Sequence, residues 1–224
     1  TNNVLSVNSS DLHSSNTALY FWDGDEYITV DHNTSSGYKY IAPMQGFMVA
    51  TDVTVTTVNF DFTKLMQTTS GSDDAIQSSP MDDDSAELFI GINQNNIDRH
   101  TEIYFNEIGV DGLTSGYDAA AFATLDTYIS TRLVETTDET EGINFYTQSL
   151  AYSEMWDKVI PIVINAMAGE EMTISITHKT TPADLKIYLE DAQEGTFTLI
   201  NNEDFVLTPS SDLSGVGRFF IHTT

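Results

Sequence analysis

The 224-residue chain contains 34 acidic and 8 basic residues, which gives a formal net charge of −26. Phosphate binding needs a basic surface, so this balance argues against nucleic acid and anionic membrane surfaces as partners. Cysteine is absent, which excludes disulfides, thiolate metal sites and cysteine nucleophiles, and no run of about 18 apolar residues predicts a membrane span.

The first segment, residues 1–66, is predicted to form a small β piece. Ala18–Trp22 and Tyr27–Val30 are β-prone runs on either side of an Asp-Gly turn, which is the pattern of a hairpin. The N-terminus has no basic region followed by an apolar one, so we expect any export signal to lie elsewhere in a longer precursor. Further strands are expected at 38–41, 46–50 and 53–62.

Residues 67–84 differ sharply from the segments on either side. They are rich in Ser and Asp and contain almost no apolar residues. This composition predicts an acidic linker or a long surface loop. It separates the N-terminal piece from residues 85–224.

The C-terminal piece, residues 85–224, contains short β-prone runs punctuated by turns. Apolar and polar residues alternate at 172–177 and 185–191, which indicates strands with one buried face. Pro161 interrupts the apolar run 159–164, so we expect that run at a sheet edge or beginning after the proline. A short helical turn is expected at 119–122, and further strands at 86–93, 101–105, 144–147, 149–152, 197–200, 204–207 and 218–222.

These patterns predict an all-β fold. An antiparallel β-sandwich or jelly roll fits the short alternating strands best, and two packed β-subdomains are the alternative arrangement. No amphipathic helix longer than about two turns is predicted.

The sequence contains no motif typical of an enzyme. The nucleophile elbow GxSxG, the zinc motif HExxH, phosphate-binding glycine loops and the EF-hand pattern are all missing. The five histidines are isolated in sequence and are expected to be structural, although His178 and His222 lie in strand-like segments and could meet across a sheet. Chance carboxylate pairs are unavoidable among 34 acidic residues, so they do not indicate a glycosidase. We therefore predict that the protein is not an enzyme.

The acidic residues offer candidate ligands for calcium. Ca²⁺ takes six to eight oxygen ligands, often from loops, and Glu107, Asp111 and Asp118 surround a Gly-rich stretch. The alternative is that Asp111 belongs to an ordinary turn and Asp118 caps a short helix. Residues 82–84 are a second acidic run, which is more typical of a solvated surface. The high charge also serves solubility, because salt screens its self-repulsion.

Aromatic residues offer a carbohydrate-binding surface. Tyr20, Trp22 and Tyr27 cluster in the first piece, and Trp156 stands alone in a loop-like segment. An exposed flat ring stacks on the C–H groups of a pyranose. The alternative is that these rings belong to the core, where most aromatic residues of a sandwich lie. Trp156 is the best single candidate for exposure.

Five segments, in this order along the chain, carry a family resemblance. They are ALYFWDGDEYITV (18–30), YIAPMQGFMV (40–49), TEIYFNEIGVDGLTSGYDA (101–119), LKIYLED (185–191) and GRFFIH (217–222). Together they resemble the C-terminal passenger region of type IX-secreted surface proteins of Bacteroidetes, the segment that precedes the sorting domain. The resemblance covers about residues 17–222 and implies an extracellular or cell-surface location after export by type IX secretion.

The chain departs from this family pattern at both ends. The family usually carries an upstream strand with a Gly-Asn-Pro-type turn, which is missing here, and no sorting domain follows Thr224. A missing first strand would leave a sheet edge open, and a strand from another chain could fill it.

Two functional hypotheses remain. The leading one is a non-catalytic extracellular module that acts in adhesion or as a subunit of an extracellular assembly. Its partners would be other protein chains, and these include further copies of itself in a homo-oligomer. The alternative is a carbohydrate-binding module of a secreted polysaccharide-degrading enzyme. An exposed Trp156, or two exposed rings among Tyr20, Trp22 and Tyr27, would favour glycan binding. A contiguous apolar surface would favour assembly.

Overall fold

The computed structural model describes residues 2–22, 27–34, 40–41, 46–51, 58–67, 85–121, 125–136 and 142–224. The chain forms two compact units. Unit 1 comprises Thr1–Met81 and Thr114–Ala119, and unit 2 comprises Asp82–Leu113 and Ala120–Thr224. The Asp-Gly turn at 23–25, the first half of the run 53–62 and nearly all of the segment 67–84 lie outside the described residues. No described helix is long and apolar enough to cross a membrane.

Unit 1 is built around the predicted hairpin. Strands β1 (Leu19–Trp22) and β2 (Tyr27–Val30) pair antiparallel, in a register that runs from Leu19 opposite Val30 to Trp22 opposite Tyr27. This confirms the hairpin prediction. The segment 46–50 contributes a single bridge, between Met48 and Tyr20, in place of a full strand. The helical elements are α1 (Asn2–Asn8) and short 3₁₀ helices at Ser9–Asp11, Ser14–Asn16 and Lys64–Met66.

Strand β1 is covered on both faces. Leu19 and Phe21 pack in one cluster with Leu5 of α1, while Tyr20 packs in a second cluster with Ala18 and Ala119. Successive side chains of a strand point to opposite faces, so each cluster lies on one side of the hairpin. The hairpin therefore forms the centre of unit 1.

Residues 114–119 pack within unit 1 although they follow strands of unit 2 in sequence. The Oγ1 of Thr17 lies 3.2 Å from the Oγ of Ser115, and the backbone N–H of His32 donates to the carbonyl of Gly116 over 2.9 Å. Gly116 has φ +85°, and a Cβ there would lie 2.9 Å from the His32 ring. This position therefore requires glycine, and unit 1 includes a segment that we had assigned to the C-terminal piece.

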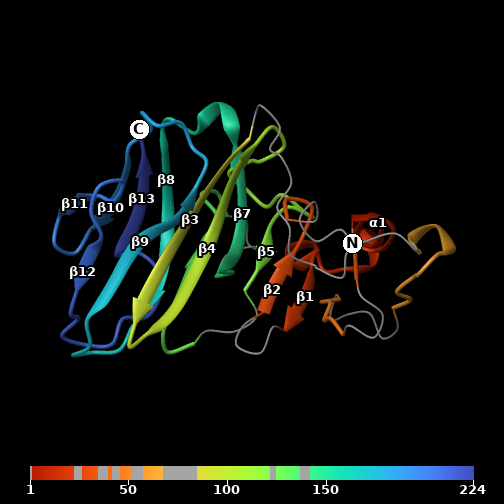
Figure 1. The fold of residues 1–224 in the computed structure, drawn as a ribbon, viewed down its shortest axis with the longest axis horizontal. Helices are drawn as coiled ribbons and strands as arrows, with labels where there is room; N and C mark the ends of the chain where they lie inside the picture. Colours follow the sequence, from red (N-terminus) through yellow and green to blue (C-terminus); the bar gives the residue numbers. More distant parts are fainter. Residues whose placement is uncertain are drawn as a thin grey trace. The chain divides into compact units, whose positions relative to one another are not determined.

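Unit 2 contains one large mixed sheet in the order β11-β10-β13-β8-β6-β7-β4-β3-β9-β12 (Figure 1). All its neighbours pair antiparallel except β4 and β7, which pair parallel. The strands are β3 (Ala86–Gln94), β4 (Ile97–Asn106), β6 (Tyr128–Thr131), β7 (Phe145–Ala151), β8 (Lys158–Asn165), β9 (Met172–Lys179), β10 (Ile187–Asp191), β11 (Thr196–Leu199), β12 (Phe205–Leu207) and β13 (Phe219–Thr223).

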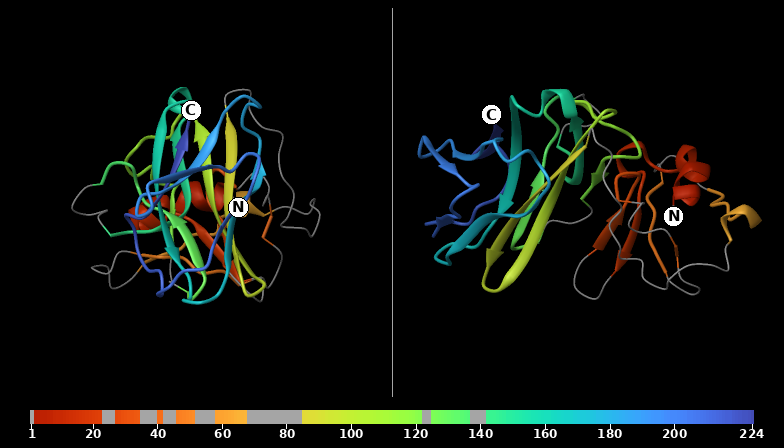
Figure 2. Two further views of the ribbon diagram at one scale, coloured as in Figure 1. Left: turned by 90° about the vertical axis from the view of Figure 1, so that its left-hand side faces the viewer. Right: turned by 45° about the horizontal axis from the view of Figure 1, so that its top comes forward.

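The sheet curves until it is nearly closed into a barrel (Figures 1 and 2). Its inward side chains form one core cluster that draws on distant strands, including Leu88 of β3, Ile162 of β8 and Leu189 of β10. Phe205 of β12 packs edge-on against Phe219 of β13, with ring centroids 5.9 Å apart, which brings together strands from opposite parts of the sheet. The all-β prediction is confirmed, with one rolled mixed sheet in place of a purely antiparallel sandwich.

The β3–β4 hairpin turns on a feature that we did not predict. Asn95 and Asn96 both adopt positive φ, 56° and 61°. A two-residue turn with positive φ at both positions matches the right-handed twist of the flanking strands, and Asn tolerates that conformation. This turn fixes a register of nine cross-strand pairs between β3 and β4.

The prediction for Pro161 was wrong. Pro161 lies inside β8, which pairs with β13 on one side and β6 on the other. Its carbonyl accepts from the N–H of Arg132, just beyond the end of β6 at Thr131. A residue's N and C=O point to the same side of a strand. The donor that proline lacks therefore faces the place where the β6 ladder ends, and little pairing is lost.

The helical turn expected at 119–122 was also wrong for its first residues. Ala119–Ala120 forms the short strand β5. Strand β6 was not predicted at all, because its residues Tyr-Ile-Ser-Thr lack a clear alternating pattern.

His32 makes the stability of unit 1 depend on pH. Burial lowers the pKa of His32 below its usual 6.5, and its ring packs against Tyr117 with centroids 5.1 Å apart. The folded state thus favours the neutral ring. This contribution is complete above about pH 6.5 and is lost as the pH falls toward the lowered folded pKa, by at most about 1.4 kcal/mol per pH unit.

We therefore expect unit 1 to lose more stability between about pH 8 and pH 5 than a His32→Gln variant does. Urea unfolding followed by Trp22 fluorescence in a Trp156→Phe background reports on unit 1, since Trp22 is then the sole tryptophan. Equal losses in the parent and the variant would contradict this expectation.

Candidate functional site

The exposed Trp22 and the half-buried Tyr27 form an aromatic pair in unit 1, which we call the aromatic ledge. The two residues are opposite each other in the β1–β2 register, and their rings meet edge-on with centroids 5.0 Å apart. The Trp22 side chain is 57% exposed. The Tyr27 hydroxyl lies 3.7 Å from the Sδ of Met48. The ledge therefore presents an indole to solvent and holds it against a half-buried ring.

Tyr20 does not belong to this surface. It is completely buried, and its backbone pairs with that of Met48. Tyr20 and Trp22 lie two residues apart in β1 and therefore share one face of the strand. That face is covered at Tyr20 by Ala18 and Ala119, so only the residue at the end of the strand emerges. Tyr20 is a core residue and offers no platform for a sugar.

Trp156 is exposed, as expected, but it lies in the other unit. It follows the buried Met155 and precedes strand β8, and 44% of its surface is exposed. Among the described residues, no aromatic ring packs against it. The four predicted sugar-binding residues thus give one pair in unit 1, one isolated ring in unit 2 and one core residue.

Asp111, a predicted calcium ligand, already has a cationic partner. Its carboxylate accepts a hydrogen bond from the ammonium of Lys158, which also binds Glu154. The Lys158 side chain is only 6% exposed. Burial lowers the pKa of Lys158, but its bonds to Asp111 and Glu154 outweigh this effect and hold the pKa above its usual value. Lys158 therefore supplies the positive charge that calcium would otherwise bring.

The other two predicted calcium ligands, Glu107 and Asp118, lie in different units. Asp118 is fully buried in unit 1, and its Oδ2 accepts from the backbone N–H of Thr114 over 2.6 Å. Glu107 belongs to unit 2 and is exposed. Among the described residues, no three His, Asp or Glu side chains are grouped so that they could hold a metal ion. The acidic run at 82–84 lies outside the described part of the chain.

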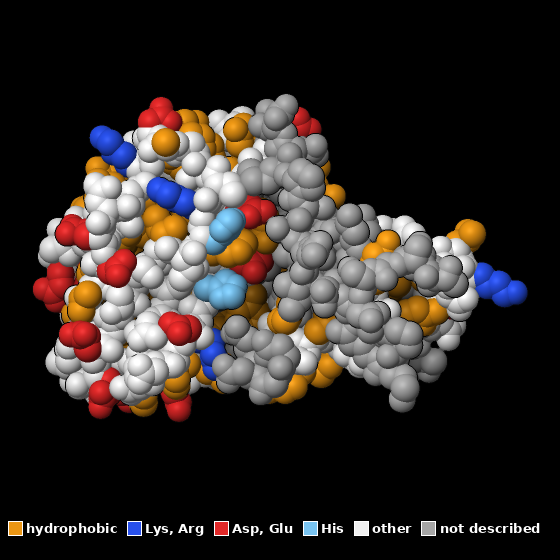
Figure 3. Space-filling view, in the orientation of Figure 1, with side chains coloured by type: hydrophobic (Ala, Val, Ile, Leu, Met, Phe, Trp, Pro, Cys, Tyr) orange, Lys and Arg blue, Asp and Glu red, His pale blue; other side chains and the backbone are white. Residues whose placement is uncertain are grey.

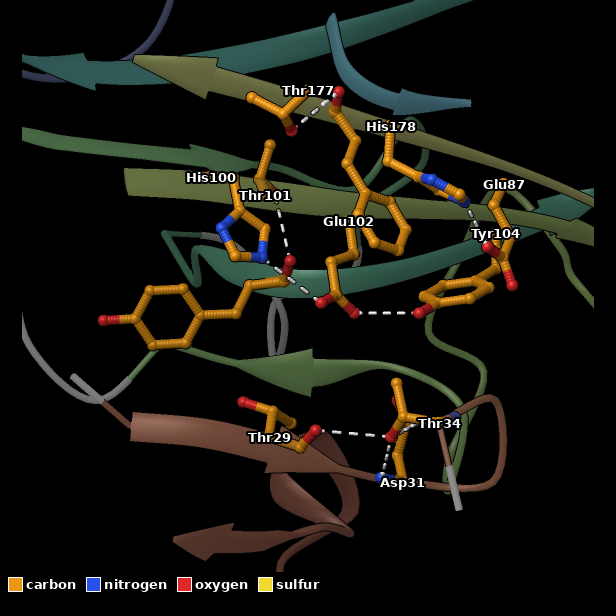
Figure 4. A network of polar contacts seen from close by, with 12 residues as sticks. Thr29, Asp31, Thr34, Glu87, His100, Thr101, Glu102, Tyr104, Thr177 and His178 are labelled. Carbon is orange, nitrogen blue, oxygen red and sulfur yellow. Dashed lines mark hydrogen bonds and ion pairs between the residues drawn. The ribbon is translucent and has the colours of Figure 1, made fainter. Parts of the chain in front are cut away.

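Two histidines on the outer face of β3, β4 and β9 are each bound to a glutamate (Figure 4). The Nε2 of His178 lies 2.8 Å from Glu87, and the Nε2 of His100 lies 3.4 Å from Glu102. A carboxylate only accepts hydrogen bonds, so Nε2 carries the proton in both rings. The Tyr104 hydroxyl donates to Glu102 over 3.0 Å.

A phenylalanine lies between these two pairs. The ring of Phe89 packs on His178 at 4.9 Å, on His100 at 5.9 Å and on Tyr104 at 5.7 Å. Figure 3 shows two histidine side chains beside acidic and hydrophobic ones on the face in view. Cross-strand pairs of this kind stabilise a sheet, so we assign the network a structural role.

Part of this network could have been found in the sequence. Alternation along 86–94 places Glu87 and Phe89 on the face opposite the buried Leu88. Their partner His178 could not be found, because the β3–β9 register shifts between Phe89 and Ile90. The predicted meeting of His178 with His222 does not occur, since β9 and β13 are not neighbours and His222 binds Glu190 instead.

Comparison with known proteins found no matching family model, no matching curated protein and no matching solved structure. The site must therefore be interpreted from its own chemistry.

Removing Asp111 should destabilise unit 2. The Asp111→Asn variant leaves the nearly buried Lys158 with one carboxylate, and we expect a loss of about 1–3 kcal/mol in the free energy of unfolding. The exposed Glu107→Gln is the matched control and should change it by less than about 0.5 kcal/mol. Urea unfolding followed by Trp156 fluorescence in a Trp22→Phe background measures both, since Trp156 is then the sole tryptophan. A calcium-dependent rise in stability that Asp111→Asn abolishes would contradict the assignment of Lys158 as the resident cation.

Proposed function

We propose that this chain is a non-catalytic extracellular module that acts in adhesion by binding neutral glycans through exposed aromatic rings. The contact residues are Trp22 and Tyr27 of the aromatic ledge, with Trp156 as a second, separate contact.

The exposure of both tryptophans carries this proposal. The chain has two tryptophans, and 57% of Trp22 and 44% of Trp156 are exposed. Tryptophan is highly buried on average, because its large apolar surface is costly to leave in water. A ligand that covers the indole recovers that free energy. The C–H face of a sugar ring suits such a surface.

The charge of the chain selects the kind of glycan. With a net charge of −26, the protein repels sulfated or otherwise acidic polysaccharides at low salt. A neutral glycan avoids this repulsion. Stacking and hydrogen bonds to it are also insensitive to the salt concentration, in contrast to the binding of a charged ligand.

The resemblance to passenger regions of type IX-secreted surface proteins supports an extracellular or cell-surface location. A net charge of −26 and a chain without cysteine are compatible with that location. A chain without cysteine must fold without disulfides, and the large core cluster of unit 2 holds its strands together.

A second candidate function is that of a subunit in an extracellular assembly. It is favoured by a different observation, the apolar outer face of strands β8, β13, β10 and β11.

An array of neutral glycans tests the proposal directly. We expect the parent to bind at least one neutral glycan, and Trp22→Ala to weaken that binding at least about tenfold, which corresponds to about 1.4 kcal/mol. Trp156→Ala tests the second contact in the same way. Val206→Ala, which removes an exposed aliphatic side chain of β12, is the control and should bind like the parent.

Two outcomes would overturn the proposal. One is a parent that binds no neutral glycan on the array. The other is a double Trp22→Ala, Trp156→Ala variant that binds as well as the parent.

A further inference from the structure

Strands β11, β10, β13 and β8 place eight side chains in two rows on one face of the sheet, which we call the outer grid. The cross-strand registers align the four strands without a shift at these positions. The first row is Leu199, Tyr188, His222 and Val159, and the second row is Phe197, Glu190, Phe220 and Pro161.

The outer grid faces away from the core. Along β10, β13 and β8, apolar residues that alternate with it, including Ile187, Leu189, Ile221 and Ile160, are fully buried in the main core cluster. Side chains alternate between the two faces of a strand, so the eight grid residues point outward. Phe197 is 57% and Val159 is 45% exposed.

The grid is apolar where an outer face is usually polar. Six of its eight members are Leu, Tyr, Val, Phe, Phe and Pro, whereas a solvated sheet face normally carries polar residues. The other two, His222 and Glu190, are hydrogen-bonded to each other, with His222 Nε2 lying 2.6 Å from Glu190 Oε2. The ring of Phe197 packs edge-on against His222 at 5.2 Å. The two polar groups of the His222–Glu190 pair therefore bond to each other within the grid.

The size of the grid limits the strength of any contact that it makes. Four strands about 4.8 Å apart and two rows about 6.8 Å apart give roughly 250–300 Å². Exposed apolar patches of a few hundred Å² on soluble proteins are often functional. This area is smaller than the roughly 800 Å² per partner of a standard stable interface, so the contact is weak on its own.

The grid also differs in charge from the rest of the chain. Two basic residues flank the grid. Lys186 precedes β10, and its backbone bonds to that of Thr224. Arg218 precedes β13, and its carbonyl accepts from the backbone N–H of Ala192. The Arg218 guanidinium binds Asp191 over 2.7 Å. The only grid carboxylate, Glu190, is paired with His222. The grid is thus a surface without an unpaired acidic side chain in a chain of net charge −26.

We propose that the outer grid is a self-association surface, whose occupant is the grid of a second copy of this chain, packed face to face about a twofold axis. Two chains of charge −26 can approach only where acidic side chains do not meet, and the grid meets that condition. Stacked sheets pack about 10 Å apart through interdigitated apolar side chains, which the six apolar grid residues supply.

The salt dependence of binding distinguishes a second copy of this chain from a basic protein partner. Self-association brings two net negative charges together, so added salt screens their repulsion and strengthens the dimer. A basic protein partner would instead be released by salt. The small contact area predicts a dissociation constant in the micromolar range or weaker.

Sedimentation velocity of the purified chain tests the proposal. We expect a dimer whose fraction rises with protein concentration from about 10 µM to 1 mM and with NaCl from about 0.05 to 1 M. Phe197→Asp and Val159→Asp each place an unpaired carboxylate in the grid and should weaken the dimer at least tenfold. Val206→Asp changes a similarly exposed residue of β12 outside the grid and should leave the dimer unchanged.

The substituted residues are exposed, so thermal melting of each variant should match that of the parent. A chain that stays monomeric over the whole range, a dimer that both grid variants leave intact, or a dimer that salt dissociates would each overturn the proposal. Because glycan binding is assigned to Trp22, Tyr27 and Trp156, its outcome is independent of this test.

Discussion

The rolled sheet of unit 2 depends on one constraint, which is that its inner face must be covered by itself. Strands from both ends of the sheet send apolar side chains into a single core cluster. The contact between Phe205 of β12 and Phe219 of β13 joins those ends. A flat sheet of this composition would leave that face in water, and each large side chain left exposed would cost about 1.5–3 kcal/mol.

Because the inner face is filled, the described part of unit 2 meets ligands and partners through its outer face, its turns and the edge strands β11 and β12. The outer face carries two kinds of surface. Around Phe89, imidazole and carboxylate groups satisfy one another across β9, β3 and β4. Over β8, β13, β10 and β11 the side chains are mostly apolar, and His222 and Glu190 are bound to each other. The first surface holds strands together, and the second has apolar area left to bury.

The sequence predicted what depends on neighbouring residues and missed what depends on distant ones. Alternation and the Asp-Gly turn were enough for the hairpin of unit 1 and for most strands of unit 2. Pro161 was misplaced because its tolerance depends on where β6 ends. The contact between Asp111 and Lys158 could not be predicted, because the two residues are 47 positions apart in the sequence. Tyr20 was taken for a surface residue because the sequence does not show that both faces of its strand are covered. Trp156 was rightly expected to be exposed.

Native-state hydrogen exchange tests the shared core most directly, with the protection of backbone amides followed by mass spectrometry at increasing denaturant. Strands β3 (Ala86–Gln94) and β9 (Met172–Lys179) lie toward one end of the sheet, and β10 (Ile187–Asp191) and β13 (Phe219–Thr223) lie toward the other. If one core holds both ends together, their amides will open in a single cooperative step with the same free energy. Separate opening of the two groups, with different free energies, would contradict the account, because the inner face could then be exposed without global unfolding.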